Sequence, residues 1–298
     1  MKKLKMPSVK ALLNAYKVGA AVLALLTAIF GALSFVTSMT ENGRYFVSSV
    51  SVTLLYISLA LTIIFAFSSV IAFEKNFIIS TPFKWIRFTY LLPAVCIASI
   101  IVNLFKKLSA NSTDEQNRII EILLVVSAFA SLFYLLSIVI NFSKTVTAGF
   151  GYVFILFCIL AIAKFHTDHS LEMNSPFKII MQFTAAATAL SILSDIRTCI
   201  GRPGPSQYLI SKICSITLSV LCVVSSAIVY SRGFSTDYII YAILFLACAI
   251  CSATELFTST ISEYQIEEEL DDIEIPADET ENTSTSTDSD PTANNDAE

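Results

Sequence analysis

Charged side chains are scarce in this 298-residue chain, and their scarcity decides its class. Only 14% of the residues are Asp, Glu, Lys or Arg, whereas 55% are hydrophobic. Soluble domains usually carry about a quarter charged residues. We conclude that most of this chain does not meet water.

Signatures of catalysis and of metal binding are also missing. The sequence contains no phosphate-binding glycine loop, no GxSxG nucleophile elbow and no HExxH zinc motif. The seven cysteines lie mainly in apolar runs, and the one pair with CxxC spacing, Cys248 and Cys251, lies inside such a run. No soluble basic patch with interleaved aromatic residues is present, as nucleic-acid binding would require. We expect no enzyme, no cofactor, no structural disulfide or zinc site, and no nucleic-acid partner.

Long apolar segments fill the chain from about residue 11 to residue 260. A bilayer core is about 30 Å thick and takes about 20 apolar residues to cross as a helix. Backbone groups in lipid must be satisfied within the segment, so such segments are helical. The sequence therefore predicts an all-α integral membrane protein with a lipid-facing surface. Its eight spans are expected at about 11–38, 47–73, 85–105, 119–141, 145–166, 177–199, 207–230 and 237–260.

The two ends of the chain carry opposite charge. Residues 1–10 form a basic N-terminus, and the apolar run after it is too long for a signal peptide, so we expect a retained first span. The 14 acidic groups from Glu263 to Glu298 have no Lys or Arg among them, leaving 10 acidic and 19 basic residues in the rest of the chain. Residues 261–298 are expected to be a disordered acidic tail. This tail is a solvated appendage, or it binds the basic cytoplasmic loops or a basic protein partner.

The distribution of Lys and Arg predicts the orientation. With the N-terminus inside, twelve basic residues fall on the cytoplasmic side and seven on the other side, which favours that orientation. An even number of spans then places the C-terminus in the cytoplasm as well. The Lys-rich start, the short loops and the lack of disulfide signals favour a bacterial inner or plasma membrane.

A short motif recurs at the start of two spans. TPFKWIRFT begins at Thr81 and opens the third span, and SPFKIIMQFT begins at Ser175 and opens the sixth. Each copy follows one span and precedes two more, which implies units of spans 2–4 and 5–7. The spacing suggests a three-helix unit repeated in inverted orientation, an architecture of many secondary transporters. The alternative is that a Pro-aromatic-Lys start is simply a suitable opening for any span. The third span also contains Pro93, which should kink it.

Two spans contain polar residues on one helix face. Thr184, Thr188, Ser191 and Asp195 follow one another at steps of four, three and four residues in the sixth span. Such a stripe ending in a carboxylate is a candidate solute or ion path, because ionisable groups in spans are costly and often functional. The alternative is that the hydroxyls bond their own helix carbonyls while Asp195 reaches headgroup water.

Three further positions complete the candidate path. Ser58 and Thr62 form a similar stripe in the second span, where helix packing is the alternative explanation. Glu255, near the end of the last span, is a candidate proton or cation site or simply a hydrated helix end.

The loop KFHTDHSLEMN contains both histidines, His166 and His169, which are weak candidate metal ligands because such spacing is more often without function. Two functions remain open. The first is a small-solute or ion transporter, and the second is a non-transporting membrane scaffold or regulatory subunit that acts through its acidic tail.

Overall fold

The computed structural model describes residues 6–40, 45–73, 77–80, 84–110, 115–168, 175–201, 204–232 and 237–263. The chain forms one compact unit up to residue 264, and the following paragraphs concern that unit. The predicted acidic tail lies outside the described residues, apart from its first three positions.

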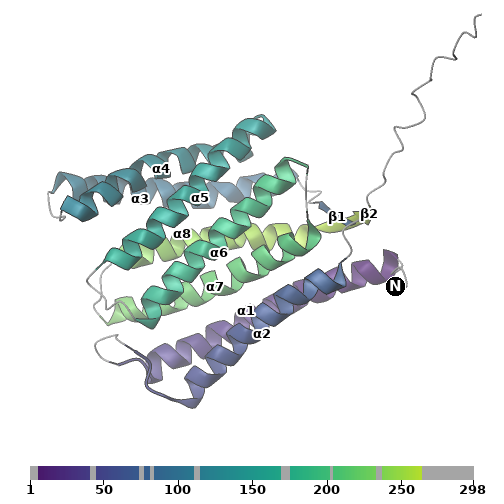
Figure 1. The fold of residues 1–298 in the computed structure, drawn as a ribbon, viewed down its shortest axis with the longest axis horizontal. Helices are drawn as coiled ribbons and strands as arrows, with labels where there is room; N and C mark the ends of the chain where they lie inside the picture. The colour runs from purple at the N-terminus through teal and green to yellow at the C-terminus, as the bar shows by residue number, and fades with distance from the viewer. Residues whose placement is uncertain are drawn as a thin grey trace, which may run out of the picture. The chain divides into compact units, whose positions relative to one another are not determined.

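Eight helices in the described part are long and apolar enough to cross a membrane. They are α1 (Met6–Thr37), α2 (Val50–Ala72), α3 (Leu91–Ser109), α4 (Glu115–Ile140), α5 (Lys144–Thr167), α6 (Pro176–Cys199), α7 (Pro205–Ser231) and α8 (Asp237–Thr258). Each predicted span corresponds to one of them, with small differences at the ends. The prediction of a multi-pass helical membrane protein is therefore confirmed (Figure 1).

The third span differs from a single kinked helix. It opens with a 3₁₀ helix, η1 (Lys84–Tyr90), which is followed directly by α3. Pro93 lies in the first turn of α3, where a missing backbone N–H breaks no bond of the helix interior. The proline therefore marks the start of the α-helix and not its middle.

The two copies of the Pro-Phe-Lys motif adopt different local structures. Residues 81–83 of the first copy lie outside the described part, and the rest of that copy forms η1. The second copy begins α6 directly, with Pro176 at the first helical position. The inverted repeat thus stays a prediction.

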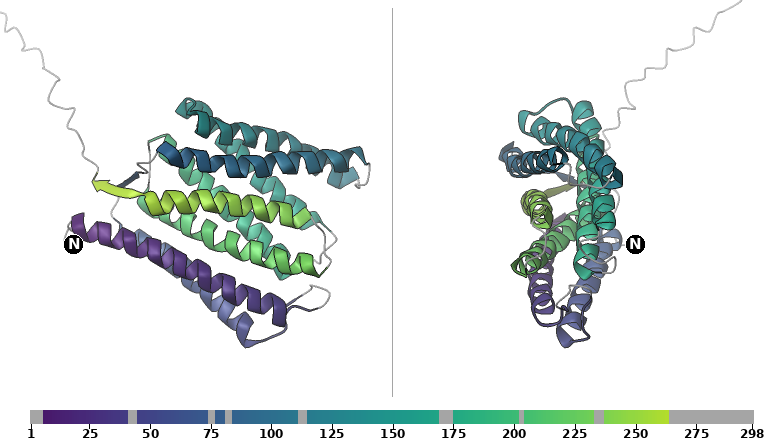
Figure 2. Two further views of the ribbon diagram at one scale, coloured as in Figure 1. Left: turned by 180° about the vertical axis from the view of Figure 1, so that it is seen from behind. Right: turned by 90° about the vertical axis from the view of Figure 1, so that its left-hand side faces the viewer.

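The helices form two layers, which are best seen end-on (Figure 2). One layer contains α3, α8, α7 and α1, and the other contains α5, α6 and α2. Helix α4 lies at one edge and packs on both α3 and α5, while α6 packs across the layers on α7 and α8. Helices α6, α7 and α8 consequently form the centre of the bundle.

Burial explains the composition of the central helices. About half or more of the apolar window is buried in α6, α7 and α8, at 50%, 56% and 56%, compared with 33% in α1 and 28% in α2. The mean hydropathy of α6, at 1.5, is the lowest of the eight, and its polar face is covered by protein. A helix that meets little lipid can carry polar side chains without exposing them to hydrocarbon.

A small sheet lies where α2 and α8 end. Strand β1 (Phe77–Ser80) pairs antiparallel with β2 (Thr260–Glu263), so the segment after α8 is joined to the connection between α2 and η1. This sheet and the start of α1 lie at the same end of the bundle (Figure 1). We call this end the N-terminal end and the opposite one the far end.

Two basic side chains cap helices that are distant in sequence. At the N-terminal end, Lys17 Nζ donates to the carbonyl of Ser259, 2.7 Å away, just after α8. At the far end, Arg232 Nη2 donates to the carbonyls of Phe35 and Val36 in the last turn of α1, at 2.9 and 3.1 Å. Cations at helix C-termini satisfy carbonyls that lack an intrahelical partner. These contacts fix α1 against both ends of the central helices.

Candidate functional site

Three ionisable side chains from three helices meet near the N-terminal end of the bundle. Lys212 Nζ in α7 lies 2.5 Å from Asp195 Oδ1 in α6 and 2.6 Å from Glu255 Oε2 in α8. The hydroxyl of Tyr90, the last residue of η1, donates to Glu255 Oε1 and lies 3.4 Å from Asp195 Oδ2. We call Tyr90, Asp195, Lys212 and Glu255 the charged cluster.

The charges in this cluster do not balance. The Lys212 side chain is 0% exposed and each carboxylate side chain is 13% exposed, so water screens them little. One ammonium faces two carboxylates, which leaves one negative charge in excess when all three groups are ionised. A buried charge without a partner is strongly unfavourable. The cluster is therefore suited to bind one more positive charge.

Tyrosine and cysteine side chains adjoin the cluster. The Tyr208 ring lies 5.6 Å from Lys212 Nζ, on the same helix. Tyr134 of α4 and Cys251 of α8 line the cavity beside Asp195. The excess negative charge is thus not offset by a second cation among these neighbours.

A small cavity adjoins the charged cluster on the side of the bundle centre. It offers about 20 Å³ to the centre of a water molecule, enough for one water. Thr188, Ser191 and Asp195 of the predicted path line it, together with Ser252 of α8. Ser191 Oγ lies 2.9 Å from Ser252 Oγ, so these two hydroxyls join α6 to α8 beside the cavity.

The two threonines of the predicted stripe, Thr184 and Thr188, donate to backbone carbonyls. Thr184 Oγ1 donates to the carbonyl of Ile180 at 2.7 Å and is also 3.2 Å from the carbonyl of Leu218 in α7. Thr188 Oγ1 donates to the carbonyl of Thr184 at 2.9 Å. These hydroxyls satisfy their hydrogen bonds on the helix backbone, as the alternative explanation of the stripe expects.

Ser58 and Thr62 lie elsewhere in the bundle. Ser58 Oγ accepts from Thr27 Oγ1 in α1 at 3.2 Å, and Thr62 Oγ1 donates to the Ser58 carbonyl at 2.9 Å. Their stripe therefore faces α1. The structure brings Asp195, Glu255 and the α6 hydroxyls together but does not bring the α2 pair to them.

A second ionic group lies at the far end. Lys164 Nζ in α5 is 3.7 Å from Glu121 Oε1 in α4 and 5.6 Å from the centre of the Tyr241 ring in α8. Nearby, Tyr238 donates to Asp168 Oδ2 at 2.6 Å. Helix α8 thus contributes Tyr241 to the far-end group and Glu255 to the charged cluster.

The histidine loop does not form a metal site in the described part. His166 lies in the last turn of α5, whereas His169 lies outside the described residues. No group of three or more His, Cys, Asp or Glu side chains within the described ranges is placed to hold a metal ion.

A larger hollow lies between α2 and α6, which do not pack on each other. Its volume is about 570 Å³, and Leu218 and Leu221 of α7 are among the residues that line it. No Asp, Glu, Lys, Arg or His is among its lining residues. Because no acidic or basic side chain lines the larger hollow, the smaller cavity at the charged cluster is the stronger candidate site.

Sequence reasoning missed Tyr90 and Lys212. Lys212 is one of the twelve basic residues counted on the cytoplasmic side, although it lies within the predicted span 207–230. Its side chain is fully buried between two carboxylates. A lysine within a predicted span indicates a nearby acidic partner, because ionisable residues in spans usually pair with one another. Nothing in the sequence distinguishes Tyr90 from the other ten tyrosines.

The fold and the site define the class of protein, an α-helical multi-pass membrane protein with a buried ionic cluster. Comparison with protein families, with curated proteins and with solved structures found no match. The functional argument therefore rests on the residues of this chain.

Proposed function

We propose that this protein is a cation-coupled transporter of a small solute or ion, and that the charged cluster binds the coupling cation. The observation that carries the proposal is the sharing of one buried ammonium, Lys212, by two carboxylates, Asp195 and Glu255, on different helices. Ionisable groups are kept inside membrane spans chiefly where they serve ion or proton movement. The excess negative charge selects a cation.

The proton is the cation that this geometry favours. The ammonium of Lys212 already occupies the position between the two carboxylates where a metal cation would sit. A proton needs no such space, because it binds to one carboxylate oxygen, and Tyr90 offers a hydroxyl to both carboxylates. The cavity of about 20 Å³ admits a water molecule that can carry the proton to the site.

Coupling follows from which contacts a proton weakens. Protonating Asp195 or Glu255 removes one of the two charges that hold Lys212, so the contact of α7 with α6 or α8 loses its ionic part. These helices form the centre of the bundle, and a change in their packing reaches most of the other spans. We infer a protein with both termini cytoplasmic, in which the charged cluster is loaded from the cytoplasmic side.

The scaffold alternative rests on composition. Apart from residues 261–263, its acidic segment lies outside the described residues, and the buried cluster has no role in a scaffold. Deleting residues 265–298 distinguishes the two, because a scaffold loses its co-purifying partner while a transporter keeps its transport response.

Charge movement across reconstituted membranes tests the proposal. Proteoliposomes on a solid-supported membrane are exposed to jumps of pH, of Na⁺ or of K⁺, and the displaced charge is recorded. We expect a response to the pH jump that Asp195→Asn and Glu255→Gln each abolish while the folded protein stays in the membrane. Asp168→Asn is the matched control, since that carboxylate lies outside the charged cluster.

Three outcomes contradict the proposal at different levels. A response to Na⁺ or K⁺ alone would show that this ion, and not the proton, is the coupling cation. An unchanged pH response in Asp195→Asn removes this residue from the mechanism. Wild-type protein that behaves like empty liposomes in all three jumps rejects cation coupling.

A further inference from the structure

The cavity beside the charged cluster does not reach the far end of the bundle, and aromatic rings lie in between. Tyr134, which lines the cavity, packs on Phe154 with ring centres 5.8 Å apart. Phe154 packs on Phe157 at 5.9 Å, and Phe157 stacks on Tyr241 at 6.4 Å. We call Phe154, Phe157 and Tyr241 the aromatic barrier; it connects α5 to α8.

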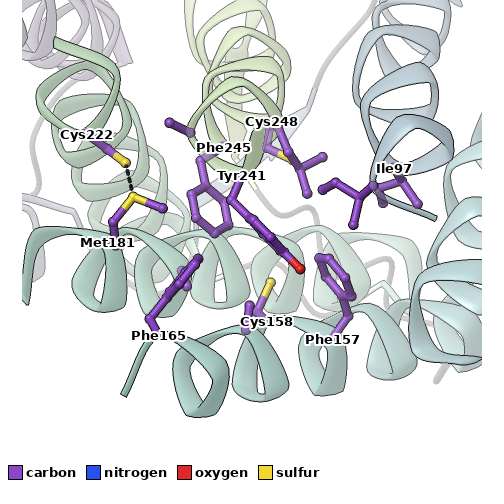
Figure 3. Packing of buried hydrophobic residues seen from close by; sticks show 14 of the residues in the cluster. Ile97, Phe157, Cys158, Phe165, Met181, Cys222, Tyr241, Phe245 and Cys248 are labelled. Carbon is purple, nitrogen blue, oxygen red and sulfur yellow. Dashed lines mark hydrogen bonds between the residues drawn. The ribbon is translucent and has the colours of Figure 1, made fainter. Parts of the chain in front are cut away.

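Tyr241 carries the polar group of this barrier. Its side chain is buried, and its hydroxyl has no hydrogen-bond partner among the described residues. Figure 3 shows this hydroxyl pointing between Cys158 and Phe157, in the apolar interior. A buried hydroxyl without a partner is unfavourable compared with a phenylalanine of the same shape. Its presence here indicates a use other than packing.

An ion pair lies on the far side of the aromatic barrier. Lys164 lies over the Tyr241 ring and pairs with Glu121, and the two side chains are only 13% and 5% exposed. The order along the bundle is then the charged cluster, the cavity, the aromatic barrier and the Lys164–Glu121 pair. Ionisable groups lie at both ends of this line, and rings separate them.

We propose that Phe157, Tyr241 and Lys164 form the outer gate of the transport path, and that the coupling proton crosses the far half of the membrane between α5 and α8. This inference rests on the proposed function, because it extends the same path from the charged cluster. The Tyr241 hydroxyl serves as the proton's hydrogen-bonding position between the cavity and Lys164–Glu121. Rotation of the Phe157 ring away from Tyr241 opens the gate.

Proton leak through a weakened gate tests this proposal without knowledge of the solute. Proteoliposomes containing the pH-sensitive dye pyranine are placed under a K⁺ diffusion potential set with valinomycin, and proton entry is followed. We expect Phe157→Ala to speed proton entry at least about tenfold, equivalent to lowering the barrier by about 1.4 kcal/mol. Phe35→Ala is the matched control, since Phe35 is equally buried but packs on Phe46 near the far end of α1.

The double variant Phe157→Ala/Asp195→Asn separates a path from a packing defect. If Phe157 and Asp195 lie on one path, the second substitution abolishes the leak. A leak that persists in the double variant, or that Phe35→Ala also produces, overturns the gate. Both results leave the pH-jump response of the wild-type protein unchanged, and the proposed function is judged by that response.

Tyr241→Phe provides a second variant in case Phe157→Ala does not fold. It keeps the ring and removes only the hydroxyl that lacks a partner, so the protein should remain at least as stable. We expect its pH-jump charge movement to fall about tenfold or more, a barrier increase of about 1.4 kcal/mol. A wild-type response in Tyr241→Phe refutes the role of this hydroxyl.

Discussion

Replacing Lys212 by methionine is the sharpest test of how the charged cluster holds the bundle together. The substitution keeps the length of the side chain and removes the ammonium that lies 2.5 Å from Asp195 and 2.6 Å from Glu255. Two carboxylates then face each other in a region where the lysine side chain had no exposure to water. Removing one partner of a buried ion pair costs about 3–5 kcal/mol.

The expected magnitude lies at the upper end of that range, because one lysine serves two carboxylates from two helices. The variant can relieve part of the cost by taking up protons, so its loss of stability should be smaller at low pH. By contrast, the neutral triple variant Asp195→Asn/Lys212→Met/Glu255→Gln contains no buried charge in the cluster. We expect it to regain most of the loss, since replacing a whole buried ionic group by neutral residues is often close to neutral.

The free energy of unfolding in mixed micelles measures both variants. A thiol-reactive dye reports unfolding, because Cys158, Cys222 and Cys248 are buried in the folded bundle and become accessible when it opens. Lys178→Met is the matched control; that lysine is also buried, but its described hydrogen bond is to a backbone carbonyl, that of Asp168, 2.7 Å away. A loss below about 1 kcal/mol for Lys212→Met, the range of exposed ion pairs, refutes the reasoning. A triple variant less stable than Lys212→Met does so as well.

Two further predictions concern the packing of the bundle. A Cβ on Gly151 in α5 would lie 2.7 Å from Ile196 in α6, whereas a Cβ on Gly149 meets nothing within 4 Å. Gly151→Val should therefore destabilise the protein by about 1–3 kcal/mol in thermal unfolding, and Gly149→Val should not. An equal loss of stability in both variants would contradict close packing of α5 on α6. Arg232→Ala removes the donor to the last carbonyls of α1 and, because Arg232 is exposed, should cost about 0.3–1 kcal/mol. Arg197→Ala, at an exposed position, is its control, and equal stability of the two variants would show that Arg232 does not cap α1.

The hydropathy pattern was sufficient to predict the spans, because a segment that crosses lipid must be apolar along its whole length and must satisfy its own backbone. Even the span of lowest mean hydropathy, predicted at 177–199, corresponds to α6. The ends of the helices were less predictable. The 3₁₀ helix before α3 and the position of Pro93 depend on local backbone geometry that hydropathy does not record.

The residues of the candidate site were likewise only partly predictable from the sequence. Asp195 and Glu255 were recognisable as carboxylates within spans, so the sequence alone nominated them. Their common partner was missed, since Lys212 was counted among the basic residues on the cytoplasmic side. Periodicity gave Ser58 and Thr62 the same standing as Thr188 and Ser191, although only the α6 pair lies beside the cavity.

By itself, the sequence determined that this is an eight-span helical membrane protein with a basic start and an acidic C-terminal segment. These properties follow from the free energy of transferring each side chain from water to lipid, which depends on the residue type and not on its distant neighbours. Tertiary structure alone decided that Lys212 bridges α6 and α8, that Tyr90 joins it, and that aromatic rings separate the two ionic groups. Such pairings depend on which helices become neighbours, and helices of nearly equal hydropathy leave that choice to packing in three dimensions.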